Sequence, residues 1–386
     1  MCKKIRTGII GSGFVGLIHL EALRRLGYVD VAALAEIDED RAKQKADQLG
    51  IPKAYGDWRH LIEDEEIEAV HICTANFLHF EMAKEVLLAK KHVICEKPLA
   101  MNSKETSTLI NLAKKKECIN AVGFNVRFYP LVQHMRTMIQ RGELGDIFTV
   151  RGSYLQDWLF YDTDYNWRVD PELSGPSRAI ADIGSHLLDL IQFVTTLKIT
   201  EVFSDFGTMH PIRKKPLEVR ETYTKEKIEA GEYEEKRIGT EDYASVLLGF
   251  DNNNTKGVIT VSQVDAGRKN QIFLEISGSK KTVCWNSETP NELWIGYRDK
   301  PNELLLKDPN LIFPEEVEFA NYPGGHNEGF PDTFKQLFRK VYECVKGNSK
   351  REEPQFPTFT DGHNEVVLCE GILKSWQEKQ WIKIEY

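Results

Sequence analysis

The fold is decided by the stretch Ile5-Arg6-Thr7-Gly8-Ile9-Ile10-Gly11-Ser12-Gly13-Phe14-Val15-Gly16. A short apolar run ends in a glycine fingerprint, and a pattern typical of a helix follows over residues 17–26. Strand, glycine turn and helix in this order are what a dinucleotide pyrophosphate needs. We expect Gly11 to permit the tight turn, Gly13 to let the backbone approach the phosphates, and Gly16 to let the helix pack closely. The helix N-terminus then offers N–H groups to the pyrophosphate.

A second apolar run, from Tyr28 to Glu36, predicts a strand that ends in a carboxylate. Glu36 lies where an acidic group accepts hydrogen bonds from the adenosine ribose hydroxyls. A carboxylate there repels a 2′-phosphate, and the following Ile37 brings no positive charge. The sequence therefore favours NAD over NADP. The alternative is that Glu36 is a solvated residue at a strand end.

Composition places the chain among ordinary globular proteins, because 386 residues suffice for two domains with a core each. A net charge of −9 argues against a nucleic-acid partner. No secretory or membrane-spanning run is visible, so we expect a cytoplasmic protein without a membrane partner. Seven scattered cysteines without a C-x-x-C pair fit reduced thiols, and we expect no metal.

The first third of the chain alternates apolar runs with amphipathic patterns. Such alternation predicts a parallel, doubly wound α/β sheet in a domain over residues 1–124. Beyond residues 5–10, the strands are expected at residues 28–36, 69–73, 92–96 and 119–124. The helices are expected at residues 39–49 (with Gly50 as the stop), 80–89 and 103–115, the last capped by Ser103.

The pattern changes after residue 124. A helix over residues 130–140 precedes alternating runs at residues 146–154, 245–250, 257–263, 271–278 and 282–285. Residues 125–386 are therefore predicted to form an α+β domain with an antiparallel sheet. Residues 213–239 are charged and poor in core residues, which suggests a surface insertion or an extension toward a partner subunit.

Two groups of residues are candidates for a catalytic role. Glu96-Lys97-Pro98 follows a buried strand, and ligands of open α/β sheets sit at the carboxyl ends of strands. Asp182 and His186 lie four apart and share one face of a predicted helix. A carboxylate beside an imidazole orients it and favours its charged form, as a general base requires. An exposed Asp–His pair that only stabilises the helix is the alternative.

With these motifs the chain resembles the Gfo/Idh/MocA family, named for glucose–fructose oxidoreductase and inositol dehydrogenase. The resemblance covers essentially the whole chain. Beyond the glycine loop it rests on Thr74-Ala75-Asn76-Phe77-Leu78-His79, Glu96-Lys97-Pro98-Leu99-Ala100, residues 123–130, Trp167-Arg168, residues 170–175 and residues 182–190. Family members usually have Pro where Ala75 stands.

The resemblance implies a Rossmann domain followed by a domain whose large, mostly antiparallel sheet often forms the subunit interface, hence a homodimer or homotetramer. It also implies that Lys97, Asp182 and His186 are the catalytic group. In that reading, His186 takes the hydroxyl proton, Asp182 orients the imidazole and Lys97 stabilises developing alkoxide character. Whether Lys97 or His186 is the ultimate base stays open.

Motifs and resemblance together give two sets of binding residues. Those expected to bind the cofactor are Gly11, Ser12, Gly13, Phe14, Val15, Gly16, Glu36, Thr74, Asn76, His79, Glu96, Lys97 and Asn125. Those expected to bind the substrate are Lys97, Arg127, Trp167, Arg168, Asp182, His186 and His326. Core packing is the alternative for Trp167, and a satisfied loop histidine is the alternative for His326.

The function these expectations favour is oxidation, by NAD, of a secondary alcohol of a sugar, an anhydrosugar such as levoglucosan, or a cyclic polyol such as inositol. A non-catalytic dinucleotide-binding sensor is one alternative, which the presence of all three catalytic residues disfavours. A redox-neutral glycosidase around tightly held NAD is another. A transferase, or an oxidoreductase that couples two sugars, stays open for the same reason.

Overall fold

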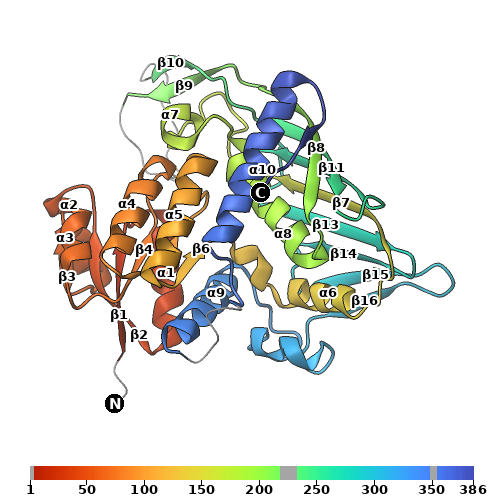
Figure 1. Ribbon diagram of the computed structural model, residues 1–386, viewed down its shortest axis with the longest axis horizontal. Coiled ribbons are helices and arrows are strands. Elements are labelled where there is room, and N and C mark those ends of the chain that lie inside the picture. The colour runs from red at the N-terminus through yellow and green to blue at the C-terminus, as the bar shows by residue number, and fades with distance from the viewer. Residues whose placement is uncertain (1–3, 218–232, 348–353) are drawn as a thin grey trace. The chain divides into compact units, whose positions relative to one another are not determined.

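The computed structural model describes residues 4–217, 233–347 and 354–386 (Figure 1). Its contacts divide the chain into two compact units. Unit 1 comprises the described residues up to Asn125 together with those of 334–366, and unit 2 comprises the rest from Val126 onward. The sequence placed residues 334–366 in the second domain, whereas their contacts join them to unit 1.

Unit 1 is built on a six-stranded parallel sheet, as the alternating pattern predicts. The strand order is β3-β2-β1-β4-β5-β6, so the order reverses between β1 and β4. Ligands of doubly wound sheets bind at such a switch point. The strands are β1 (Ile5–Ile10), β2 (Val29–Ala35), β3 (Lys53–Tyr55), β4 (Ala69–Ile72), β5 (His92–Cys95) and β6 (Asn120–Val122).

The helices of unit 1 follow the predicted positions with two corrections. α4 begins at Asn76, four residues earlier than expected, so residues 76–79 belong to the helix and Ala75 is its N-cap. The cap of α5 is Asn102, whose side chain accepts the N–H of Glu105 at 3.0 Å, and Ser103 is already helical. The sequence analysis also missed β3 and α3. The helices are α1 (Phe14–Leu26), α2 (Glu39–Leu49), α3 (Trp58–Glu63), α4 (Asn76–Leu88) and α5 (Ser103–Lys116).

Unit 2 contains a nine-stranded sheet of order β16-β15-β14-β13-β7-β12-β11-β8-β17. Its pairs are antiparallel except β7 with β12, which confirms the predicted α+β class. The strands are β7 (Ile147–Leu155), β8 (Ile199–Gly207), β11 (Tyr243–Phe250), β12 (Lys256–Ser262), β13 (Gln271–Gly278), β14 (Thr282–Asn286), β15 (Glu292–Gly296), β16 (Glu303–Leu306) and β17 (Ile382–Lys383); β9 (Ile212–Pro216) pairs separately with β10 (Tyr233–Arg237).

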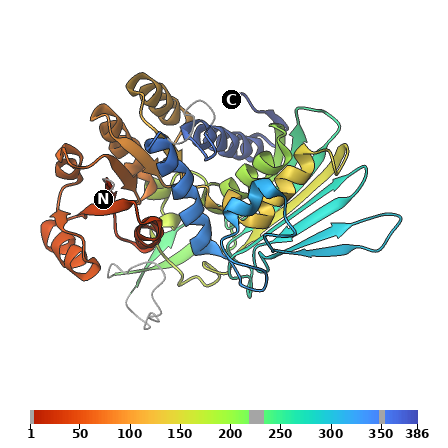
Figure 2. The ribbon, with the colours of Figure 1, turned by 90° about the horizontal axis from the view of Figure 1, so that it is seen from below.

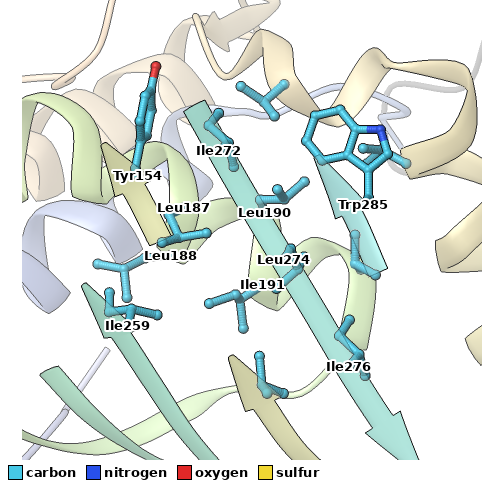
Figure 3. Close-up of a cluster of buried hydrophobic side chains, with 14 of the residues drawn as sticks. Tyr154, Leu187, Leu188, Leu190, Ile191, Ile259, Ile272, Leu274, Ile276 and Trp285 are labelled. Carbon is cyan, nitrogen blue, oxygen red and sulfur yellow. The ribbon is translucent and has the colours of Figure 1, made fainter. Parts of the chain in front are cut away.

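One face of this sheet carries the core of unit 2. Helices α6 (Pro130–Gln140) and α8 (Ser185–Thr195) lie on that face (Figure 2). Leu187 and Leu190 of α8 are fully buried, as are Leu274 and Trp285 of the sheet (Figure 3). Burying such side chains contributes about 1.5–3 kcal/mol each. The packing fixes α8, the helix that carries His186, against the sheet.

The remaining elements are short or terminal. They are the 3-10 turns η1 (Asn125–Phe128), η2 (Trp167–Val169) and η4 (Pro314–Phe319), the π-helix η3 (Ile180–Gly184), and the helices α7 (Pro171–Ser174), α9 (Phe330–Val345) and α10 (Phe359–Glu378). Within the described residues, no helix combines the length and apolarity that crossing a bilayer requires.

The charged segment over residues 213–239 differs from its prediction at its start. Arg213 is completely buried, and its guanidinium pairs with Asp242 at 2.7 Å. It also donates to the carbonyl oxygen of Leu159 at 2.9 Å. Charge alone suggested solvent exposure, but a buried arginine is stable when a carboxylate and carbonyl oxygens surround it. Residues 218–232 of the segment lie outside the described residues.

Candidate cofactor and catalytic site

The glycine loop has the geometry its sequence predicts at two positions. Gly11 has φ +90°, and a Cβ there would lie 2.9 Å from the Cys73 carbonyl oxygen. A Cβ on Gly16 would lie 2.0 Å from the Gly11 carbonyl oxygen, so only glycine lets α1 pack this closely. A Cβ on Gly13 would meet nothing within 4 Å. Phe14 and Gly13 are exposed and Val15 is half-buried at the start of α1, which leaves room beside the helix N-terminus.

Glu36, directly after β2, is tied to the glycine loop. Its carboxylate accepts both the N–H and the hydroxyl of Ser12, each at 2.6 Å. Its other oxygen lies 3.2 Å from Nε of Arg41, on α2. The carboxylate therefore lies beside the glycine loop, and a positive charge that was not predicted from the sequence faces it.

The carboxyl ends of β4 and β5 bring four predicted residues to one edge of the sheet. Thr74 follows β4, and Asn76 opens α4 with 8% of its surface exposed. Glu96 and Lys97 follow β5; Glu96 is 7% exposed and Lys97 is half-buried. This edge is the ligand-binding edge of a doubly wound sheet.

His79 lies behind that edge rather than on it. Its side chain is completely buried, with Nδ1 2.7 Å from the Pro98 carbonyl oxygen and Nε2 3.1 Å from that of Thr74. Burial lowers the pKa of His79, so the ring is neutral and only one nitrogen donates at a time. This placement favours bracing the Thr74 and Pro98 turns over the predicted direct contact with the cofactor. Asn125, 1% exposed, is likewise enclosed, three residues after the end of β6.

A buried imidazole network, formed by Glu96, His19, His71, Tyr342 and Thr7, stands behind the same edge. His19 Nε2 lies 3.1 Å from the Glu96 carboxylate, and the two Nδ1 atoms of His19 and His71 are 2.9 Å apart. His71 Nε2 lies 2.9 Å from the Tyr342 hydroxyl, which also contacts Thr7. Burial, and to a lesser extent His19, holds the pKa of His71 well below its usual value.

The hydrogen bonds of this network run in one direction when each ring has one donor and one acceptor nitrogen. The Glu96 carboxylate only accepts, so His19 donates to it and accepts from His71, which accepts from Tyr342. Every ring nitrogen is then satisfied without a buried positive charge. This network was not predicted from the sequence, because His19 and His71 lie within apolar runs there.

In unit 2, Asp182 and His186 lie in consecutive helical segments. Asp182 belongs to η3, where the N–H of Ser185 bonds the carbonyl oxygen of Ile180, five residues back. His186 is the second residue of α8 and is 9% exposed. The predicted helix is therefore present, but its start is a π turn, a feature that is frequent at functional sites.

Asp182 is held on both of its oxygens. Oδ2 accepts the side-chain N–H of Gln263 at 3.0 Å, and Oδ1 lies 3.7 Å from Nε of Arg168. The guanidinium of Arg168 also lies 4.5 Å from the ring centre of Trp167, which is half-buried. The structure thus brings three predicted residues together, Trp167, Arg168 and Asp182.

Two further predicted substrate residues stand apart from this group. Arg127 forms a bidentate pair with Asp189 of α8, with its Nε 2.8 Å from the carboxylate, and lies over Phe193 at 4.9 Å. His326 is exposed on a loop that the buried Lys307 anchors through the carbonyl oxygen of residue 326, at 2.8 Å. No contact joins either side chain to Asp182 among those described.

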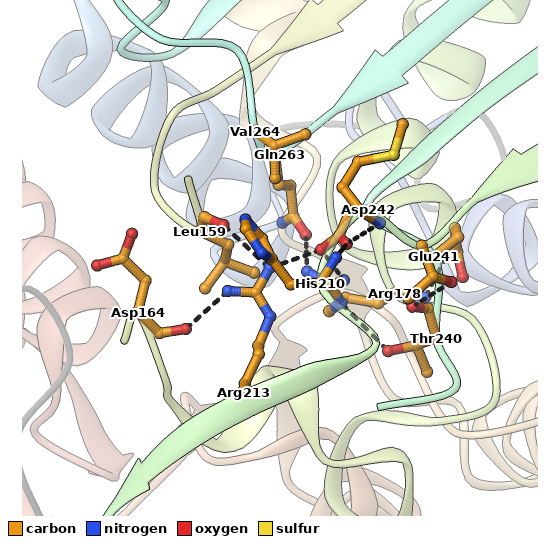
Figure 4. A network of polar contacts seen from close by, with 12 residues as sticks. Leu159, Asp164, Arg178, His210, Arg213, Thr240, Glu241, Asp242, Gln263 and Val264 are labelled. Carbon is orange, nitrogen blue, oxygen red and sulfur yellow. Dashed lines mark hydrogen bonds and ion pairs between the residues drawn. The ribbon is translucent and has the colours of Figure 1, made fainter. Parts of the chain in front are cut away.

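A guanidinium network supports the Asp182 segment; its members are Arg178, Arg213, Thr240, Glu241, Asp242 and Gln263 (Figure 4). Asp242 bridges Arg178 and Arg213, and all three are at most 1% exposed. Burial alone would raise the pKa of Asp242, but the guanidinium groups of Arg178 and Arg213 hold it below its usual value. This network was not predicted from the sequence, where its one visible sign is the carboxylate pair Glu241-Asp242 just before a strand.

The arrangement suits proton transfer, because a carboxylate and an imidazole lie four residues apart on consecutive helical segments. Among the residues that the structure describes, no group of three His, Cys, Asp or Glu side chains is placed to hold a metal ion, and the six cysteines there are free thiols. The glycine loop at Gly11, Gly13 and Gly16 fits a dinucleotide. Side chains at Gly11 or Gly16 would collide with the neighbouring backbone and open the tight turn, and the backbone at Gly13 has nothing within 4 Å of a Cβ, which leaves space for the pyrophosphate.

Comparisons with known proteins agree with the two units. Residues 5–124 match the model of an oxidoreductase family with an NAD-binding Rossmann fold, and residues 132–284 match that of the GFO/IDH/MocA C-terminal domain. The chain is 32% identical over 381 residues to a myo-inositol 2-dehydrogenase of Thermotoga maritima, covering 99% of both chains. It is 27% identical over 397 residues to a levoglucosan dehydrogenase of Pseudarthrobacter phenanthrenivorans, covering 99% and 98%.

Solved structures give the same picture. A levoglucosan dehydrogenase in complex with NADH and L-sorbose superposes with a TM-score of 0.89 at 25% identity, covering 99% of both chains. The same enzyme in complex with NADH gives a TM-score of 0.88 at 25% identity, covering 99% of this chain and all of that one.

Proposed function

Because this chain belongs to the Gfo/Idh/MocA family of NAD-binding oxidoreductases, we propose that it oxidises a secondary alcohol of a sugar, an anhydrosugar or a cyclic polyol. The observation that carries the proposal is the pinned Asp182 carboxylate in the turn before His186, with Arg168 and Trp167 beside it. The related levoglucosan and inositol dehydrogenases support the substrate class.

The chemistry follows from the side chains. NAD, when bound, supplies the acceptor for a hydride from the carbinol carbon. His186 takes the hydroxyl proton, Asp182 orients the imidazole and stabilises its charged form, and Lys97 donates a hydrogen bond to the reacting oxygen. Trp167 offers an apolar face to a sugar ring, and the guanidinium of Arg168 offers donors to hydroxyl groups.

The cofactor is held by the glycine loop of unit 1 in this proposal. The backbone at Gly11 and Gly13 and the N-terminus of α1 receive the pyrophosphate, and Glu36 receives the ribose hydroxyls. Glu36 favours NAD, although Arg41 beside it weakens the repulsion of a 2′-phosphate. We expect Glu36→Ser with Ile37→Arg to shift kcat/KM toward NADP, whereas Arg41→Ala should strengthen the NAD preference. An unchanged preference in the double variant would contradict the placement of the ribose.

The face of the nine-stranded sheet opposite α6 and α8 supports a homodimer or homotetramer. Apolar side chains gather there in an exposed position, on β11, β12, β15 and β16: Leu247, Val258, Trp294, Leu304 and Leu306. Trp294 and Leu304 are direct partners across β15 and β16. Light scattering should show an oligomer that Trp294→Glu with Leu304→Glu dissociates, while Leu311→Glu, exposed on a loop, leaves it intact.

The decisive experiment is nicotinamide reduction at mildly alkaline pH. NAD and NADP are tested with inositols, aldoses and anhydrosugars, for the wild type, Lys97→Ala and His186→Ala. We expect turnover with one substrate group and a loss of about 10²-fold or more in each variant. If NAD binds tightly but no substrate reduces it, the redox-neutral glycosidase or the sensor replaces this proposal.

A further inference from the structure

Gln263 occupies a fixed position next to Asp182. It follows β12 directly and is 1% exposed. Its backbone N–H donates to the carbonyl oxygen of Asp242 at 3.0 Å, and its own carbonyl oxygen accepts from Leu159 at 3.0 Å. Both bonds fix the backbone of Gln263, so the position from which its side chain extends is fixed as well.

The side-chain amide of Gln263 has only one workable orientation. Arg178 Nη1 donates to Oε1 at 3.1 Å, and a guanidinium carries donors only. The amide nitrogen therefore faces Asp182 and donates to Oδ2 at 3.0 Å. A flipped amide would set its N–H groups against the guanidinium and its oxygen against the carboxylate, losing both bonds.

Arg178 in turn cannot move. Its Nη2 pairs with Asp242 and its Nε donates to the Thr240 hydroxyl at 3.2 Å. Its backbone N–H donates to the Glu241 carboxylate at 2.9 Å, and the N–H of Ile180 donates to the same oxygen at 3.0 Å. The start of η3 and the amide of Gln263 are thus fixed by one connection, residues 240–242, between β10 and β11 (Figure 4).

From this geometry we infer that Gln263 is a positioning residue for the reaction: it fixes the carboxylate of Asp182 and acts on His186 through it. The inference rests on the proposed function. The donor on Oδ2 selects one rotamer of Asp182 and stabilises its ionised form. Arg178 fixes Gln263, and no side chain of the guanidinium network other than Gln263 has a described bond to Asp182.

A double-mutant cycle tests the inference. Gln263→Met keeps the length and removes the amide, and we expect it to lower kcat about 10- to 100-fold with the KM for NAD unchanged. In an Asp182→Asn background the same change should cost less than about 2-fold, because Gln263 acts through Asp182. Gln271→Met is the matched control: Gln271 is also buried and donates to a carboxylate, Glu288, at 3.1 Å.

A second measurement does not need a substrate. In protein labelled with ¹³C-histidine, Gln263→Glu should raise the titration midpoint of His186 by about one pH unit, since it adds a negative charge beside Asp182. Gln271→Glu should leave the midpoint unchanged. His186→Asn identifies the resonance.

The outcomes separate the two proposals. Equal losses from Gln263→Met in both backgrounds, or an unmoved His186 midpoint in a folded Gln263→Glu protein, overturn the positioning role. A shifted midpoint in a protein that reduces NAD with no sugar or polyol supports the placement of Gln263 while the proposed function fails. A smaller loss in the Asp182→Asn background, together with the midpoint shift, supports both.

Discussion

The imidazole network behind Glu96 depends on the buried, neutral ring of His71, whereas the guanidinium network behind Asp182 is built from charges. In unit 1, a carboxylate is satisfied by His19, which is satisfied in turn by His71. In unit 2, one buried carboxylate, Asp242, compensates two buried guanidinium groups. Each network ends at a residue that we place in or beside the reaction.

Because of this difference, the two networks should lose their stabilising contribution under different conditions. A neutral network is lost by protonation in mild acid, because a buried imidazolium is costly. A charged network withstands mild acid, but it fails when one partner is removed and a buried charge is left alone. The two networks should therefore respond in opposite ways to mutation and to pH.

The largest effect is expected from Asp242→Asn. It leaves Arg178 and Arg213 buried without their carboxylate, which costs about 3–5 kcal/mol or prevents folding. The free energy of unfolding is measured by denaturant titration. Asp205→Asn is the control: Asp205 pairs with Lys379 on the surface, and its loss should change stability by less than about 1 kcal/mol. Equal stabilities for both variants would show that the buried network contributes nothing.

The second largest effect is expected in how the free energy of unfolding depends on pH, which should distinguish the two networks. Because the pKa of His71 is lowered in the folded state, the unfolded chain binds the extra proton first, and stability falls as pH drops below about 6.5. Burial lowers the pKa of His134, in unit 2, to about 4, so His134 contributes a similar fall of stability with falling pH. Asp242 keeps its contribution until pH falls below about 4, since its folded pKa is depressed.

The test compares slopes rather than absolute stabilities. His71→Gln should reduce the loss of stability between pH 6.5 and 5 by up to about 1.4 kcal/mol per pH unit. His60→Gln, a change at an exposed histidine, should leave the slope as it is. If His71→Gln has the slope of the wild type, the buried His71 is not neutral and the comparison between the networks fails.

Local elements could be predicted from the sequence because their causes are local. Asp38 caps α2 by accepting the N–H of Arg41 at 2.8 Å, and Gly50 ends it at φ +63°. The glycine loop is another local case, since a Cβ on Gly16 would lie 2.0 Å from the carbonyl oxygen of Gly11, five residues before it. Both patterns are readable within about ten residues.

The support of the candidate site could not be predicted in this way. Arg178 and Asp242 are 64 residues apart, and nothing in either segment indicates the other. The spacing of Asp182 and His186 suggested a regular helix, but the segment starts as a π turn whose first residue, Ile180, donates its N–H to Glu241 from a distant segment. The charge of its segment predicted that Arg213 is exposed. It is buried for the same reason, because its partners come from distant segments.

The smallest effect is expected at the far end of the imidazole network. Tyr342→Phe removes one hydroxyl and leaves His71 Nε2 without its donor, which should cost about 1–3 kcal/mol. Tyr297→Phe, which removes a hydroxyl that donates to the surface residue Glu303, should cost less than about 0.5 kcal/mol. Because neutral groups are involved, the cost should be nearly independent of salt, whereas the surface pair of Asp205 should weaken with added salt. A strong salt dependence for Tyr342→Phe would mean that the network behind Glu96 carries charge after all.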